Sequence, residues 1–304
     1  MLVYTFDRTF DGLLTAVFDA FALHQQPEEL VAEGDVLPMF CDEVHQVATA
    51  SDKSGRVWRG LEKQLKRETL HLIAVSWLSE ARELYTPLFH YIYKVFQLKA
   101  DISTNFSDAD VLYVTNTARR VMHEQHRMKQ FVRFQKAKDG TYLGVVSPDN
   151  DVLPLIIDHF ADRFRDQQWL LFDARRKYGY YHAAERTADM VSFSPPSEGP
   201  GEVISSEGSG EVIPSEGLGD GGHSPLLSEG LGEAFRITFE NADALPFDLQ
   251  TGKLSDELLS ENDQLFQELW RTYFKAICIR ERLNPKKQLN DMPRRYWRYL
   301  TEKQ

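Results

Sequence analysis

The sequence predicts an α+β protein in which a central antiparallel sheet is covered by helices from the N-terminal third and the C-terminus. Two observations lead to this fold class. Apolar residues recur with the helical period of about 3.6 near both ends of the chain, and the period changes to two from Phe131 onward. The 304 residues are 42% hydrophobic and 12% aromatic, which is enough for a substantial core.

We expect one domain, formed by residues 1–183 and 235–304. Its helical part is residues 1–130, its strand-rich core is 131–183 with 235–240, and its C-terminal helices lie within 255–302. Residues 184–234 are interpreted as a separate inserted loop.

The N-terminal part is predicted to begin with a strand and to continue mainly as helices. Apolar residues within 10–23 fall on one helical face. Thr86 and Pro87 are typical of a helix start, with threonine as N-cap and proline at the first helical position. The elements expected here are strands at 3–7 and 43–49, and helices at 10–23, 55–84 with a break near Arg67, 86–98 and 107–130.

The middle of the chain is predicted to hold two strand pairs. Lys138-Asp139-Gly140 is a hairpin signal between the first two strands, and Arg175-Arg176 marks a second turn. The amphipathic stripe of the last long helix, which contains Phe266, Trp270 and Tyr273, is expected to pack on the domain. The elements expected from here on are strands at 131–136, 141–147, 169–173, 178–182, 191–193 and 235–239, and helices at 150–165, 256–283 and 294–301.

The inserted loop is low in complexity and strongly acidic. Ser-Glu-Gly recurs four times, and the repeat has too few large apolar residues to form a core, so we expect disorder. A role as a mimic of nucleic-acid charge, a role in docking a partner, and a tolerated repeat expansion all remain open.

The net charge of −11 is unevenly distributed. Residues 182–234 hold ten acidic residues against one arginine, so the rest of the chain is close to neutral. Residues 271–304 carry a net +7 and residues 118–140 a net +5. The overall acidity therefore conceals two basic regions that are compatible with a polyanionic partner.

Arginine occurs repeatedly beside aromatic residues in these basic regions and between them. A guanidinium group stacks on rings and binds phosphate through two parallel donors, which favours a nucleic-acid interface. A histidine beside such a surface can donate to phosphate. The candidate nucleic-acid-binding residues are His126, Arg127, Arg133, Arg163, Arg175, Arg176, Tyr178, Arg294, Arg295 and Trp297.

Four segments carry a resemblance to a known family: HRMKQFVRF, DVLPLIIDHFADRF, QWLLFDARRKYGYY and MPRRYWRYLTEK. They resemble a bacterial family of probable DNA metabolism or putative DNA repair proteins, as does the N-terminal YTFDRTFDGLLTAVFDAF. The resemblance implies a role in DNA repair. It also implies a radical-SAM DNA-modification protein and a uracil-DNA-glycosylase-like protein as partners, in addition to DNA. It assigns no catalytic residue.

Two alternatives to a DNA-binding role are kept open. One is an enzyme acting on nucleic acid or a modified base, with His159 or Asp173 as the acid–base group. Its competing structural interpretation is that Asp173 caps the turn at Arg175 or pairs with Arg175 or Arg176. The other is a protein-interaction adaptor that makes no DNA contact.

Several classes of protein are not favoured by the sequence. It has no P-loop, no dinucleotide-binding glycine motif and no nucleophile elbow. His123 and His126 lack the spacing of a zincin helix, so we expect no metal, and no cofactor is indicated. Cys41 and Cys278 are far apart and suit a reducing compartment. Because no signal peptide or membrane span is recognisable, we expect a cytoplasmic location.

Overall fold

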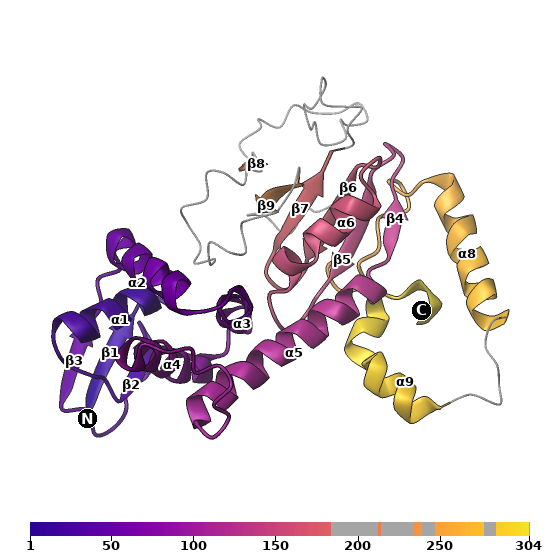
Figure 1. The fold of residues 1–304 in the computed structure, drawn as a ribbon. Helices are drawn as coiled ribbons and strands as arrows, with labels where there is room; N and C mark the ends of the chain where they lie inside the picture. The colour runs from indigo at the N-terminus through magenta and orange to yellow at the C-terminus, as the bar shows by residue number, and fades with distance from the viewer. Residues whose placement is uncertain (184–211, 214–233, 239–246, 277–283, 304) are drawn as a thin grey trace. The chain divides into compact units, whose positions relative to one another are not determined.

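The computed structural model describes residues 1–183, 212–213, 234–238, 247–276 and 284–303. It confirms that helices and strands are mixed in this chain (Figure 1). The described residues form two compact units. One contains residues 1–124 and 149–152, and the other contains residues 125–148 and those from 153 onward. The boundary lies near the predicted change from helical to strand periodicity.

The first unit is built on a three-stranded parallel sheet in the order β2-β1-β3. This sheet differs from the expected antiparallel one. The reason is the helix between the first two strands, which returns the chain to the starting edge so that the second strand runs in the same direction. The strands are β1 (Leu2–Phe6), β2 (Glu29–Ala32) and β3 (Glu43–Gln46), and the helices are α1 (Phe10–Ala22), α2 (Ser51–Gln64), α3 (Arg67–Trp77), η1 (Arg82–Leu84) and α4 (Tyr85–Leu98).

The core of the first unit is aromatic and aliphatic. Phe10 is 1% exposed and packs edge-on against Trp58 and at a tilt against Trp77. Burying one such side chain contributes about 1.5–3 kcal/mol. Tyr4 and Phe6 of the central strand are fully buried in the same cluster.

Helix boundaries in this unit follow the sequence in two places and differ in a third. The expected break near Arg67 is present, between Gln64 and Arg67. Asp108 accepts hydrogen bonds from the N–H groups of Asp110 and Val111 at the start of α5 (Ala109–Phe131), as capping predicts. Thr86 caps no helix, because its hydroxyl instead accepts a hydrogen bond from the N–H of Leu30 in β2.

The second unit is built on a six-stranded sheet in the order β4-β5-β6-β7-β9-β8. Both expected hairpins are present and antiparallel, but β5 and β6 pair in parallel, so the sheet is mixed. The crossover through α6 causes this direction. The elements are β4 (Phe134–Lys136), β5 (Tyr142–Val146), η2 (Leu153–Leu155), α6 (Ile157–Arg163), β6 (Trp169–Asp173), β7 (Tyr178–His182), β8 (Val212–Ile213), β9 (Ala234–Thr238), α8 (Glu261–Ala276), α9 (Pro285–Asp291), η7 (Arg294–Tyr299) and η8 (Thr301–Lys303).

An aromatic cluster attaches α6 to this sheet. Phe160 of α6 stacks with Phe164 and lies edge-on to Phe134 of β4 and Trp169 of β6. Trp169 also stacks on His182 of β7, at 5.1 Å between ring centroids. The side of α6 that bears Phe160 is therefore fixed against the strands.

The apolar stripe of α8 is exposed, which corrects the expectation that it packs on the domain. Phe266 is 65% and Tyr273 55% exposed, whereas Trp270 is anchored at its indole nitrogen. The expected strand at 191–193 and most of the acidic loop at 184–234 lie outside the described residues. None of the helices in the described ranges is long and apolar enough to cross a membrane.

Candidate nucleic-acid interface

The turn between β6 and β7 is organised by a buried aspartate. Asp173, the last residue of β6, is fully buried and accepts backbone hydrogen bonds from Arg175 at 2.8 Å and Arg176 at 3.2 Å. Its second oxygen receives Nη1 of Arg176 at 2.8 Å. The same nitrogen reaches the carbonyl of Pro148, after β5, at 3.2 Å. Arg176 thus holds the adjacent ends of two parallel strands together.

The surroundings of Asp173 shift the pKa of its carboxyl group. Burial raises the pKa of Asp173, and the Arg176 guanidinium with the turn N–H groups opposes this without overcoming it. Both carboxylate oxygens are engaged within the turn. This geometry matches the capping interpretation of Asp173.

A second buried carboxylate holds Arg133. Glu302 has a side chain that is 0% exposed and receives Nη2 of Arg133 at 2.7 Å. Its other oxygen receives the indole N–H of Trp270 at 3.0 Å. The guanidinium group also lies 5.6 Å from the centre of the Trp270 ring. Arg133 therefore joins the end of α5 to both α8 and the C-terminal residues.

The pKa of Glu302 is lowered from its ordinary value of 4.5. Burial alone would raise it, but the hydrogen bond and the charge of Arg133, with the Trp270 N–H, outweigh burial. Glu302 is consequently ionised at neutral pH, and the guanidinium group of Arg133 compensates its negative charge.

Residues 294–303, which we call the Arg–aromatic segment, place four cations over rings. The distances to the ring centroids are 5.8 Å for Arg294 over Trp297 and 4.7 Å for Arg295 over Tyr296. They are 4.8 Å for both Arg298 over Tyr299 and Lys303 over Trp297. Arg294, Arg295 and Arg298 are exposed, whereas Tyr296 is buried and anchors the segment.

The end of α5 lies against this segment. Phe131 contacts Tyr296 at 6.0 Å between ring centroids, and Arg127 donates to the carbonyl of Asn290 in α9 at 3.0 Å. His126 is exposed on α5 and is hydrogen-bonded to the side chain of Gln130, one helical turn further along. The structure therefore brings His126, Arg127 and Arg133 to the same region as Arg294, Arg295 and Trp297.

Tyr299 connects the segment with the β6–β7 turn. Its hydroxyl donates to the carbonyl of Leu249 and is also hydrogen-bonded to Ser147, which follows β5, and it lies within reach of the Asp173 charge. Burial raises the pKa of Tyr299, and the Arg298 charge opposes this. The carboxyl ends of β5 and β6 and the Arg–aromatic segment are consequently neighbours.

Four other candidate residues have different surroundings. Arg163 is exposed at the end of α6, 5.6 Å from the Phe164 ring, and Arg175 is exposed in the turn. His159 packs edge-on to Phe160, and burial with the Lys129 and Arg163 charges lowers its pKa. Tyr178 is buried in β7 beneath the Arg236 guanidinium. Tyr178 is thus a core residue of the sheet.

Sequence reasoning missed three residues that organise these contacts. Glu302 and Trp270 hold Arg133, and buried Glu124 accepts hydrogen bonds from the N–H groups of Asp149 and Asn150. The only available signal for Glu302 was a single acid within a strongly basic stretch. No group of three or more potential metal ligands occurs among the described residues.

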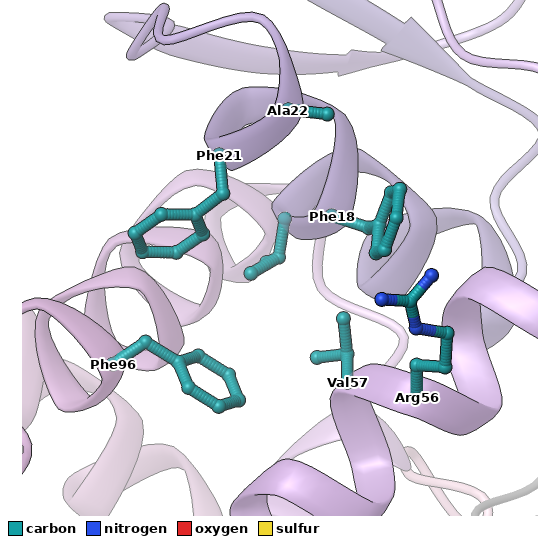
Figure 2. A pocket seen from close by; sticks show the side chains of 7 residues that line it. Phe18, Phe21, Ala22, Arg56, Val57 and Phe96 are labelled. Atoms are coloured by element: carbon teal, nitrogen blue, oxygen red, sulfur yellow. The ribbon is translucent and has the colours of Figure 1, made fainter.

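The first unit has a shallow apolar hollow of its own, shown in Figure 2. Phe18 and Phe21 of α1 line it with Val57 of α2 and Phe96 of α4. Arg56 also lines the hollow, and its guanidinium group lies 4.9 Å from the centre of the Phe18 ring. None of the candidate residues from the sequence lines this hollow.

The fold and these contacts define a mixed α/β protein with an Arg–aromatic surface on its second unit. The chain belongs to the domain-of-unknown-function family DUF4130, whose family model matches residues 82–302. The match includes every candidate site residue. No curated protein and no solved structure matches the chain.

Proposed function

We propose that this protein binds DNA through the Arg–aromatic segment and the adjacent end of α5. The single observation that supports this most is the set of four cation–ring pairs within ten residues of chain, three of them with exposed arginines. Such pairs offer phosphate contacts from the guanidinium groups and ring faces on which bases stack.

The charge around the segment supports the same proposal. Lys286 and Lys287 of α9 are exposed and precede it. Glu302 contributes little negative field, because its charge is buried and compensated by Arg133. The exposed charge of residues 285–303 is thus strongly positive although the whole chain is acidic.

Arg133 and Arg176 have a supporting role in this proposal. Each donates to a carboxylate that is 0% exposed, so neither guanidinium is available as a whole to a phosphate. They position the segment and the turn, and Arg294, Arg295 and Arg298 make the phosphate contacts.

The test is the salt dependence of binding to a labelled oligonucleotide of about 20 nucleotides, single-stranded and duplex, by fluorescence anisotropy. Arg294→Ala with Arg298→Ala should weaken binding to all sequences and reduce the salt slope by about two for duplex DNA. Trp297→Ala should weaken binding with an unchanged slope, because stacking carries no charge. Arg119→Ala, which removes another exposed arginine over a ring, is the matched control. An unchanged slope in the folded double variant would refute the proposal.

We further propose that the DNA-bound protein acts with a radical-SAM DNA-modification protein and a uracil-DNA-glycosylase-like protein, as the family resemblance implies. Co-purification of each candidate with the wild type is the test, performed with and without nuclease. Association that survives nuclease and is retained by Arg294→Ala with Arg298→Ala would favour the adaptor alternative. For the acid–base alternative, Asp173 is not favoured as the reacting group, because both of its carboxylate oxygens are occupied in its turn.

A further inference from the structure

The apolar hollow of the first unit lies where three helices meet (Figure 2). Its rings come from α1 and α4, and Val57 of α2 closes the third side. The hollow has a volume of about 360 Å³. Small-molecule sites usually have volumes of about 300–1,000 Å³. The hollow therefore suits a small molecule better than a whole helix of a partner protein.

The aromatic wall of the hollow is supported by residues outside it. Phe21 of α1 stacks on Tyr93 of α4, with 4.4 Å between the ring centroids. Phe96 lies edge-on to Phe21 at 6.0 Å and also rests against Gly60 of α2. A Cβ at Gly60 would come within 2.8 Å of Cε1 of Phe96, so the ring keeps its place because this position is a glycine. The wall therefore depends on contacts that a bound molecule would not have to break.

Two cations lie over the Phe18 ring at the rim of the hollow, and they differ in their partners. Lys53 lies 5.7 Å from the ring centre, and the Asp19 carboxylate holds its ammonium group at 2.8 Å. Arg56 is exposed, and its guanidinium group lies closer to the same ring centre. In the part of the chain that the structure describes, no carboxylate lies within ion-pair distance of Arg56. The rim therefore carries a positive charge with no counter-ion among these residues.

We propose that this hollow binds a small organic anion with a flat aromatic body and one carboxylate. The body packs against the rings of Phe18, Phe21 and Phe96, whose edges and faces favour another aromatic group. The carboxylate accepts two parallel hydrogen bonds from the Arg56 guanidinium at the rim. This site goes beyond the proposed DNA binding, because none of its residues belongs to the Arg–aromatic segment.

The first test compares two probes of similar shape and opposite charge, 1-naphthoate and 1-naphthylmethylammonium. Both are titrated against the full chain by ligand-observed NMR. Naphthoate should bind saturably and at least about tenfold more tightly than the cation, because only the anion completes the contact with Arg56. Saturable naphthoate binding that is absent up to about 10 mM, or equal affinity for the two probes, would overturn the proposal.

Removing the charge at the rim is the second test. Arg56→Gln should weaken naphthoate binding by about tenfold or more, and it should leave binding of the cationic probe no weaker. Arg59→Gln is the matched control, since Arg59 is another exposed arginine of α2 and does not line the hollow. Undiminished naphthoate binding by the folded Arg56→Gln variant would refute the role of this guanidinium.

The apolar part of the site can be tested without a change of charge. Gly60→Ala places a Cβ against the Phe96 ring, which then has to leave its position in the wall. We expect naphthoate binding to weaken by about threefold or more, as overpacking displaces a lining ring. Gly55→Ala in the same helix is the control, because its Cβ would meet nothing within 4 Å. Equal naphthoate affinity in the two variants would contradict binding in the hollow.

A last comparison separates this site from the DNA-binding proposal. The Arg–aromatic segment also combines cations with rings, so it offers naphthoate another place to bind. Naphthoate affinity should be unchanged in Arg294→Ala with Arg298→Ala, whatever the effect of that variant on DNA binding. Loss of naphthoate binding there, with retention in Arg56→Gln, would place the anion on the segment and overturn the proposal.

Discussion

Arg133 and Glu302, 169 residues apart in the sequence, form a 2.7 Å ion pair in which the carboxylate is 0% exposed. The pair joins the start of the sheet to the C-terminal residues of the same unit. Removing one partner of such a buried ion pair destabilises the folded state, because the other charge stays buried without compensation.

Arg133→Ala should therefore destabilise the second unit by about 3–5 kcal/mol, because it leaves the Glu302 carboxylate buried and uncompensated. The free energy of unfolding in urea measures this effect. Arg165→Ala is the control, since its pair with Asp162 is long and exposed and is worth about 0–1 kcal/mol. Equal losses in the two variants would contradict the structural role of Arg133.

The stability should depend on pH through Glu302. Its folded pKa lies below the ordinary 4.5, so the unfolded state takes up the proton first as the pH falls. The stabilising contribution is complete above pH 4.5 and disappears as the pH passes down through the folded value. Glu302→Gln should remove this part of the acid dependence. The difference between the two unfolding curves across acidic pH isolates the Glu302 contribution from those of the other carboxyl groups.

Asp173→Asn should be tolerated better than Asp173→Ala. The amide oxygen can still accept the N–H groups of Arg175 and Arg176, whereas alanine leaves those donors and the Arg176 guanidinium without their acceptor. We expect losses of about 1 kcal/mol and about 3 kcal/mol in the free energy of unfolding. Similar losses in both variants would show that the turn does not depend on the carbonyl-type acceptor.

Gly12→Ala should destabilise the first unit, because a Cβ at this position would lie 2.2 Å from Oδ1 of Asp7. The clash would displace the residues that hold Thr9, the N-cap of α1. A loss of about 1–3 kcal/mol is expected from such overpacking. Gly55→Ala in α2 is the matched control, since its Cβ would meet nothing within 4 Å and the helix should gain up to about 1 kcal/mol. Thermal unfolding of both variants checks the contrast.

Much of the element pattern could be predicted because it is local. A few neighbouring residues are enough to indicate each of three features: the period change at Phe131, the turn at Lys138–Gly140 and the break before Arg67. The directions of the strands that are connected through helices were not accessible in this way. The parallel pairing of β5 with β6 depends on a crossover through α6, and β2 has only four residues from which to recognise it.

The candidate site was predictable in composition but less so in its connections. The basic stretch from Arg294 to Lys303 shows its charge and rings directly in the sequence. The partner of Arg133 is a single glutamate 169 residues away, which no local pattern identifies. The exposed face of α8 was misread for a related reason: amphipathic spacing shows that a face is apolar, but it does not show what covers it.

The Arg–aromatic segment combines a wholly enclosed carboxylate, Glu302, with an outward-facing guanidinium four residues earlier, at Arg298. A ligand that binds the Arg298 guanidinium while the Glu302 carboxylate is buried binds the folded state more tightly than the unfolded one. Such a ligand raises the melting temperature of the second unit in proportion to the logarithm of its concentration. A thermal-shift screen of this protein can therefore find ligands for the segment before any reaction is known.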